Sequence, residues 1–325
     1  MQKSRKGKTS RAQRIAFLLI LVPVLMFILT TLNIIWNSVP AVIVYGLPTL
    51  FSTKFSSAFS GIFIPGQVGL LPSLWGSIML AVLALTFALP IAMAMSIFAS
   101  EFSLKGTGGA MELLISIFSG IPPIIYSLLS IFVLVNFVRP KLAGQGFPDS
   151  YLISLMGKVV NGPIEKSTLL GAIFLTLLII PFMFPLILDA IRNVPESLKE
   201  ASFGAGATRW YTLWHVTLPG ALPGIMAAIS LGILKTIGDV VIAAWTIGYG
   251  RDGLPKPLYD IFEPVSPLTS TGASLINGLV PGAANHQATT QDAVAYFSAL
   301  LLMILAFVIL GVVNLAQHFL VRRME

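Results

Sequence analysis

Residues 193–219 read NVPESLKEASFGAGATRWYTLWHVTLP, and this more polar stretch separates two long apolar runs. The run before it covers residues 169–188, and the run after it covers residues 222–247. An α-helix needs about 20 mostly apolar residues to cross the hydrocarbon core of a bilayer, so each run is long enough to span a membrane. The stretch 193–219 is therefore predicted to join two membrane-spanning helices on one side of the bilayer.

Four further apolar runs lie outward from this pair, at residues 15–36, 75–100, 113–138 and 293–320. The chain is 56% hydrophobic and 10% charged, and its mean hydropathy is +0.89. Soluble domains carry roughly 25% charged residues, so this surface is not built to face water on all sides. These features predict an all-α, polytopic membrane protein with about six transmembrane helices in a lipid bilayer.

The basic residues indicate the orientation of the chain. Its formal net charge is +7, and six of its twenty Lys and Arg residues stand in the first fourteen positions, just before an apolar run. Such clusters mark the cytoplasmic flank of a membrane helix, so we expect no nucleic-acid partner. Residues 1–14 are predicted to be a cytoplasmic tail, and an even helix count returns the C-terminus to the cytoplasmic side of the cell membrane. A signal peptide is the competing interpretation, but the run 15–36 exceeds the ~7–15 apolar residues of a signal core.

Few side chains in this sequence could carry catalysis. The chain has no cysteine, which excludes disulfides, thiol catalysis and cysteine metal sites. Three histidines, His215, His286 and His318, are scattered, and no nucleophile stands beside a base. Glu112 and Asp189 stand at predicted helix ends, where solvation is the default explanation. We therefore expect no catalysis, no metal site and no cofactor in this chain.

The first part of the stretch 193–219 has the pattern of a short helix. Asn193 can cap it, and Pro195 suits its first turn. Leu198, Ala201 and Ala205 recur at spacings that place them on one helical face, which predicts an amphipathic helix.

The second part has the pattern of another short helix. Gly204 and Gly206 are expected to end the first one. The next helix is predicted to run from Thr208 towards Val216 and to stop at Pro219, because proline lacks the backbone N–H that a helix interior needs.

The spacing of this stretch resembles the loop motif of ABC importer permeases: Glu-Ala-Ala, three residues, Gly, nine residues, Ile, one residue, Leu-Pro. Every interval matches, with serine for the second alanine and valine for isoleucine. The resemblance implies that this loop is a coupling helix that docks on a cytoplasmic ATPase. The residues it assigns to coupling are Glu200, Ala201, Ser202, Gly206, Val216, Leu218 and Pro219.

The same resemblance implies the type I ABC importer permease fold and a set of partners. These are a second permease subunit, two ATPase subunits and an extracytoplasmic solute-binding protein. ATP and Mg²⁺ would belong to the ATPase partner, and this chain would be a non-catalytic subunit.

Three further segments resemble the phosphate-transport permeases within that class. They are residues 97–102 (IFASEF), 119–126 (SGIPPIIY) and 235–239 (KTIGD). In the last segment Lys235 stands in place of an arginine and Asp239 in place of a glutamate. The resemblance implies inorganic phosphate as the cargo.

Lys235 and Asp239 also stand out on physical grounds. They are four residues apart in a predicted transmembrane helix, so they are expected on one helical face. Ionisable groups at membrane depth cost roughly 2.5–3.5 kcal/mol each, and they are usually paired or functional. Two interpretations stay open: a neutralised pair that stabilises packing, or a pathway site in which Lys235 attracts an oxyanion. With Gly238, Pro122 and Tyr126, these residues are the candidate substrate pathway.

The predicted organisation is the tail, a first helix with an external loop (15–70) and a permease domain (71–325). The long loop at residues 248–291 is expected to be an ordered external cap or a flexible lid. The predicted function is the permease subunit of an ATP-driven importer, most directly of phosphate. The alternatives are a secondary transporter that uses Lys235 and Asp239 as an ion relay, and an ABC importer of another oxyanion such as sulfate or molybdate.

Overall fold

The computed structural model describes residues 11–54, 68–103, 107–133, 168–247, 253–261, 263–277 and 287–322. Within these ranges the chain is built from helices and contains no strand. Residues 1–10 of the predicted tail, residues 55–67 of the first external loop and parts of the loop 248–291 lie outside the described residues, and residues 11–14 of the predicted tail belong to the first helix.

The helices occur in the following order along the chain. They are α1 (Arg11–Tyr45), α2 (Leu47–Leu50), α3 (Leu71–Ile97), α4 (Thr107–Ser119), α5 (Pro123–Val133), α8 (Thr168–Arg192), α9 (Glu196–Gly204), α10 (Arg209–Thr212), α11 (Leu218–Gly238), α12 (Val241–Thr246), α13 (Leu268–Asn277) and α14 (Gln287–Arg322). Two π-helical segments, Phe98–Phe102 and Leu213–Thr217, continue α3 and precede α11. Among the described residues, five helical spans are long and apolar enough to cross a membrane, and the bent pair α4–α5 makes a sixth. The predicted all-α, roughly six-span architecture is confirmed.

The core forms around α8, which packs against both α3 and α11. Ala84, Ala88 and Ala92 of α3 are fully buried in the same apolar cluster as Ile179 and Met183 of α8. Small side chains at such an interface let two helix backbones approach closely, which is how helices associate inside membranes. The α3–α8 contact is therefore the centre of the bundle.

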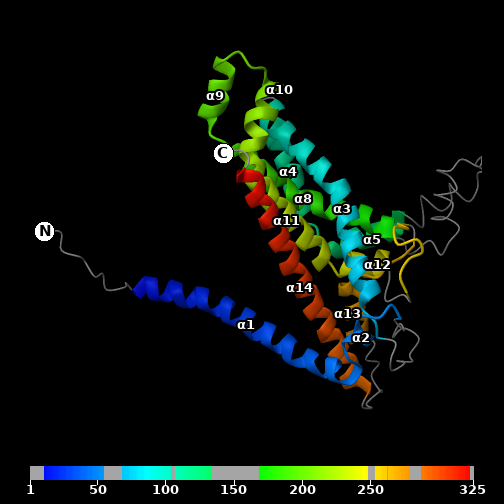
Figure 1. Cartoon of the computed structure of the whole chain (residues 1–325). Coiled ribbons are helices and arrows are strands. Elements are labelled where there is room, and N and C mark those ends of the chain that lie inside the picture. The colour runs from blue at the N-terminus through cyan, green and yellow to red at the C-terminus, as the bar shows by residue number, and fades with distance from the viewer. Residues whose placement is uncertain are drawn as a thin grey trace, which may run out of the picture.

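Helix α1 is longer than the predicted run 15–36 and lies mostly apart from the other helices (Figure 1). Its side chains from Leu19 to Trp36 are largely exposed, although most of them are apolar. It meets the bundle near its C-terminal end, where Ala41 is buried in a cluster with residues of α14. An apolar helix with so much free surface fits a lipid environment.

The predicted continuous helix over residues 113–138 is wrong, because the chain bends by 86° between α4 and α5. The bend falls at Gly120, Ile121 and Pro122, just before Pro123. Proline removes a backbone donor and disfavours helical geometry in the residue before it, so two consecutive prolines end the helix. The described part of this span ends at Val133.

The predicted continuous helix over residues 222–247 is also broken. It divides into α11 and α12, with Asp239 in an extended backbone conformation between them. The carboxylate of Asp239 accepts a hydrogen bond from the backbone N–H of Ile242 at 2.8 Å, so it satisfies a free donor at the start of α12.

The described part of the loop 248–291 is packed into the bundle, which agrees with the ordered alternative. Helix α13 packs against α14 and α3. The Ser77 hydroxyl of α3 accepts a hydrogen bond from Leu268 N at 2.9 Å, and the Ser73 and Thr271 hydroxyls lie 2.8 Å apart. The end of α3 that carries Ser73 is thus held by hydrogen bonds to α13.

Candidate functional site

The segment α9–α10 projects at one end of the bundle, with α2 and α13 at the opposite end (Figure 1). Helix α9 begins at Glu196, and no side chain caps it. The predicted cap by Asn193 is wrong because Asn193 N–H donates to Asp189 O at 2.9 Å and so belongs to the end of α8. The C-terminal end of α14 lies at the same end of the molecule as α9 (Figure 1).

Gly206 closes α9 in the way predicted from its position. Its φ is +86°, in the left-handed region that favours glycine. Around it, Ala205 N–H donates to Ala201 O at 3.1 Å and Gly206 N–H donates to Phe203 O at 2.9 Å. These bonds satisfy carbonyls that the helix end leaves free.

The second short helix has the predicted start but not the predicted end. The Thr208 hydroxyl accepts a hydrogen bond from Tyr211 N at 3.2 Å and caps α10. Pro219 does not stop the helix, because the π-helical segment after α10 leads directly into α11, with Pro219 in its first turn. A π turn widens the backbone, so it makes room for a proline ring that would clash in a regular α-helix.

The apolar face predicted for α9 is exposed in the chain. Leu198, with 51% of its surface accessible, and Ala201 and Ala205 are all exposed, and so is the charged Glu200. A nine-residue helix is too short to be stable in water on its own. An exposed apolar face on such a helix is a candidate docking surface.

The seven predicted coupling residues divide into two groups. Glu200, Ala201 and Gly206 lie on the exposed side of α9 and its turn. The others pack within the chain. Ser202 is half-buried, and its hydroxyl lies 2.9 Å from that of Thr212. At the start of α11, Leu218 is buried, and Val216 and Pro219 are half-buried. The first group is accessible to a partner, and the second packs within the chain.

Sequence reasoning missed the contact that joins α9 to the end of α3. Lys199 is the buried residue of α9, and its Nζ lies 2.6 Å from Oε1 of Glu101 in the π-helical end of α3. The two side chains are only 10% and 18% exposed. Removing one partner of a buried ion pair typically destabilises a protein by roughly 3–5 kcal/mol, because the other charge stays unpaired. Lys199 gave no signal in the sequence because a lysine in a polar loop is normally solvated.

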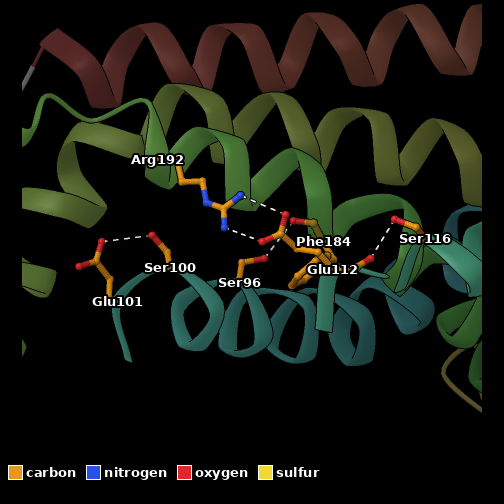
Figure 2. A network of polar contacts seen from close by, with 7 residues as sticks. All are labelled: Ser96, Ser100, Glu101, Glu112, Ser116, Phe184 and Arg192. Atoms are coloured by element: carbon orange, nitrogen blue, oxygen red, sulfur yellow. Dashed lines mark hydrogen bonds and ion pairs between the residues drawn. The ribbon is translucent and has the colours of Figure 1, made fainter. Parts of the chain in front are cut away.

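A second ion pair lies at the same end of the bundle. Arg192 of α8 donates two hydrogen bonds to Glu112 of α4, at 3.1 and 2.5 Å (Figure 2). Glu112 is partly solvated as expected, with 36% of its side chain exposed, and it also has Arg192 as an ion-pair partner. Glu112 and Asp189 also line a shallow cavity between α4 and α8, together with Ser116 and Ser119. Figure 2 shows this pair in one view with Ser96 of α3 and with Ser100 and Glu101 of the π-helical segment that continues α3.

The predicted pathway residues of the 119–126 segment lie at the α4–α5 bend. Pro122 is exposed, whereas Tyr126 is 5% exposed. The Tyr126 hydroxyl donates to the Phe118 carbonyl at 2.8 Å, so it connects α5 to the last turn of α4. Tyr126 therefore stabilises the bend itself.

The other pathway residues lie at the α11–α12 break. Lys235 is exposed near the end of α11, Gly238 is the last residue of α11, and Asp239 is 7% exposed. The helix ends at Gly238, so Asp239 is the residue that follows α11, one turn after Lys235, and these two residues form no ion pair. The Asp239 carbonyl accepts a hydrogen bond from Thr269 Oγ1 at 3.2 Å, which joins the break to α13.

The structure brings the two broken spans together, since α12 packs against α5. Breaks inside membrane helices are tolerated where protein or a water-filled path satisfies the freed backbone groups. Among the described residues, no group of three or more His, Asp or Glu side chains could hold a metal ion.

Comparisons with known proteins agree with these observations. A family model described as "Binding-protein-dependent transport system inner membrane component" matches residues 94–325. A phosphate transport system permease protein PstC of Xylella fastidiosa is 25% identical over 238 residues, which cover 71% of this chain and 72% of that protein. The PstC protein of Pasteurella multocida is 28% identical over 288 residues, covering 84% and 83%.

A solved structure has a similar fold. A chain of a bacterial alginate ABC transporter, in complex with an alginate-pentasaccharide-bound periplasmic protein, superposes with a TM-score of 0.63. The match covers 96% of each chain at 16% identity. The arrangement of helices is therefore that of an ABC importer permease.

Proposed function

The chain belongs to the family of binding-protein-dependent transport system inner membrane components, and on this premise we propose that it is the permease subunit of an ATP-driven phosphate importer. A separate ATPase would dock on the exposed side of α9. A second permease would complete the pathway, and a solute-binding protein would deliver the cargo from outside.

The observation that carries the proposal is the exposed apolar and acidic surface of α9. Glu200, Ala201 and Gly206 lie there in the spacing of the importer motif, and the chain buries none of them. A transporter driven by an ion gradient has no need of such a surface. The docking of a motor subunit explains both its exposure and its position at the end of the bundle.

Phosphate is favoured as the cargo by the names of the relatives, which include several phosphate transport system permeases. In this proposal α9 and both termini lie on the cytoplasmic side. The basic cluster in the first fourteen residues supports that orientation, and so does the position of the end of α14 beside α9 (Figure 1).

The pathway is proposed to run past the paired breaks at α4–α5 and α11–α12. Lys235 is exposed there, so its ammonium group can attract an oxyanion between this chain and a second permease. Lysine is a point charge without the two-pronged match of arginine to phosphate. Its weaker hold suits a transit site, which must release what it binds.

The test uses the chain reconstituted in vesicles with its ATPase and solute-binding protein. We expect ATP-dependent phosphate uptake that excess sulfate and molybdate do not inhibit. Glu200→Arg should reduce the amount of ATPase that co-purifies, because it reverses the charge of the docking surface. Inhibition by sulfate or molybdate would reassign the cargo, and phosphate uptake that needs only an ion gradient would refute the importer.

A further inference from the structure

We propose that the ion pair between Lys199 and Glu101 transmits the movement of α9 to α3, and thereby couples ATP hydrolysis to the change in access of the pathway. The inference rests on the proposed function, since it assigns the route by which a docked ATPase would act on the bundle. Lys199 and Glu101 are then positioning residues, and neither touches the cargo.

The first argument is that the buried side chain of α9 is charged, not apolar. Lys199 is its buried residue, while the apolar Leu198 and Phe203 are exposed. Its side-chain attachments are the Lys199–Glu101 pair and the hydrogen bond between Ser202 and Thr212. The Ser202 bond joins α9 to α10, which continues into α11, whereas the ion pair is the side-chain link from α9 to the end of α3.

The second argument is that neighbouring residues of α9 serve different partners. Glu200 is exposed on the surface proposed to meet the ATPase, whereas Lys199 is directed into the chain. Consecutive residues of an α-helix project about 100° apart, so a rotation or shift imposed on Glu200 moves Lys199 as well. The short, rigid helix converts movement of the docking surface into movement at Glu101.

The third argument concerns what Glu101 is attached to. It lies in the π-helical segment that continues α3, and Ser100 Oγ donates to its carboxylate at 3.3 Å (Figure 2). The adjacent Phe102 contacts the ring of Trp210 in α10, with ring centroids 6.2 Å apart. The end of α3 therefore contacts both short helices of the loop.

Helix α3 reaches the parts of the molecule that have to move. It packs along α8 and α11, and its other end is hydrogen-bonded to α13 through Ser73 and Ser77. At the break between α11 and α12, the Asp239 carbonyl accepts a hydrogen bond from the Thr269 hydroxyl of α13. A continuous set of packed and hydrogen-bonded elements thus leads from α9 through α3 and α13 to the proposed pathway.

The experiment measures the ratio of phosphate taken up to ATP hydrolysed by the complete complex in vesicles. Lys199→Ala and Glu101→Ala should each keep the ATPase bound but lower this ratio by at least about fivefold, the lower end of usual coupling between sites. Lys199→Arg should keep the ratio, because it keeps the charge. Thr86→Ala is the matched control in α3, since the Thr86 hydroxyl bonds only to Val82 of the same helix.

Two further variants restore the link by different means. The charge exchange Glu101→Lys with Lys199→Glu should recover the ratio. Because the chain has no cysteine, Glu101→Cys with Lys199→Cys places the chain's only two thiols at this contact, and a short thiol cross-linker should restore the ratio that the uncross-linked variant lacks.

An unchanged ratio in the single alanine variants would overturn the proposal. So would loss of the bound ATPase in those variants, which would make the pair a support for docking only, or a failure of both restoring variants. Failure of the proposed function has a different signature, because the unaltered chain itself would then bind no ATPase or show no ATP-dependent phosphate uptake.

Discussion

Substitution of Gly206 by alanine isolates the contribution of one backbone turn to ATPase docking. An added Cβ at this position meets no atom within 4 Å, so the substitution introduces no clash. The φ of +86° is the source of the penalty, since an L-residue in the left-handed region is disfavoured by roughly 1–2 kcal/mol. Because 1.4 kcal/mol corresponds to a factor of ten, we expect the ATPase to bind roughly 5- to 30-fold more weakly.

The assay is the dissociation constant between the purified ATPase and the chain in detergent or nanodiscs. Gly204→Ala is the matched control, because an added Cβ there also meets nothing within 4 Å and Gly204 lies inside α9 with a helical backbone. It should bind as the unaltered chain does. Gly206→Asn should fall between the two, since asparagine tolerates the left-handed region better than alanine. Equal affinities for Gly206→Ala and Gly204→Ala would refute the reasoning.

Three further outcomes follow from the packing. Tyr126→Phe should lower stability by about 0.5–1.5 kcal/mol, because it removes the hydrogen bond across the α4–α5 bend; thermal unfolding in detergent measures this, and an unchanged midpoint would contradict it. Lys235→Ala and Asp239→Ala should each reduce phosphate uptake while the ATPase stays bound, and normal uptake in both would reject their pathway role. Asp239→Asn keeps a side-chain oxygen that can cap α12, so reduced uptake in this variant would assign the effect to the lost charge. Ala88→Leu should destabilise the α3–α8 contact by about 1–3 kcal/mol, seen as a lower unfolding temperature, because the site has no room for the larger side chain.

The short helices of the coupling loop show where local reasoning succeeds. The positions of Gly206 and Thr208 were sufficient to predict a turn and a cap, because both depend on backbone groups within three residues. The cap by Asn193 failed since α8 extends further than its apolar run. The prediction that the helix stops at Pro219 was wrong because a π turn accommodates the proline, and no residue pattern predicts that turn.

The two helix breaks show the limit of hydropathy. Residues 113–133 and 222–247 each contain an apolar run, and hydropathy does not change where a run bends. The two consecutive prolines at 122 and 123 were a usable signal for the first break. The second break has no proline beside it. There Asp239 caps α12, whereas its spacing from Lys235 had predicted only a place on the same helical face.

The sequence by itself determined the membrane class, the approximate spans and the motif of the exposed loop, because apolar length and residue spacing are local properties of the chain. Only the tertiary structure decided that Lys199 meets Glu101, 98 positions away, that α13 is built into the bundle, and that α5 and α12 of the two broken spans pack together. These contacts join segments distant in the chain, and their geometry follows from how the whole bundle packs around α8.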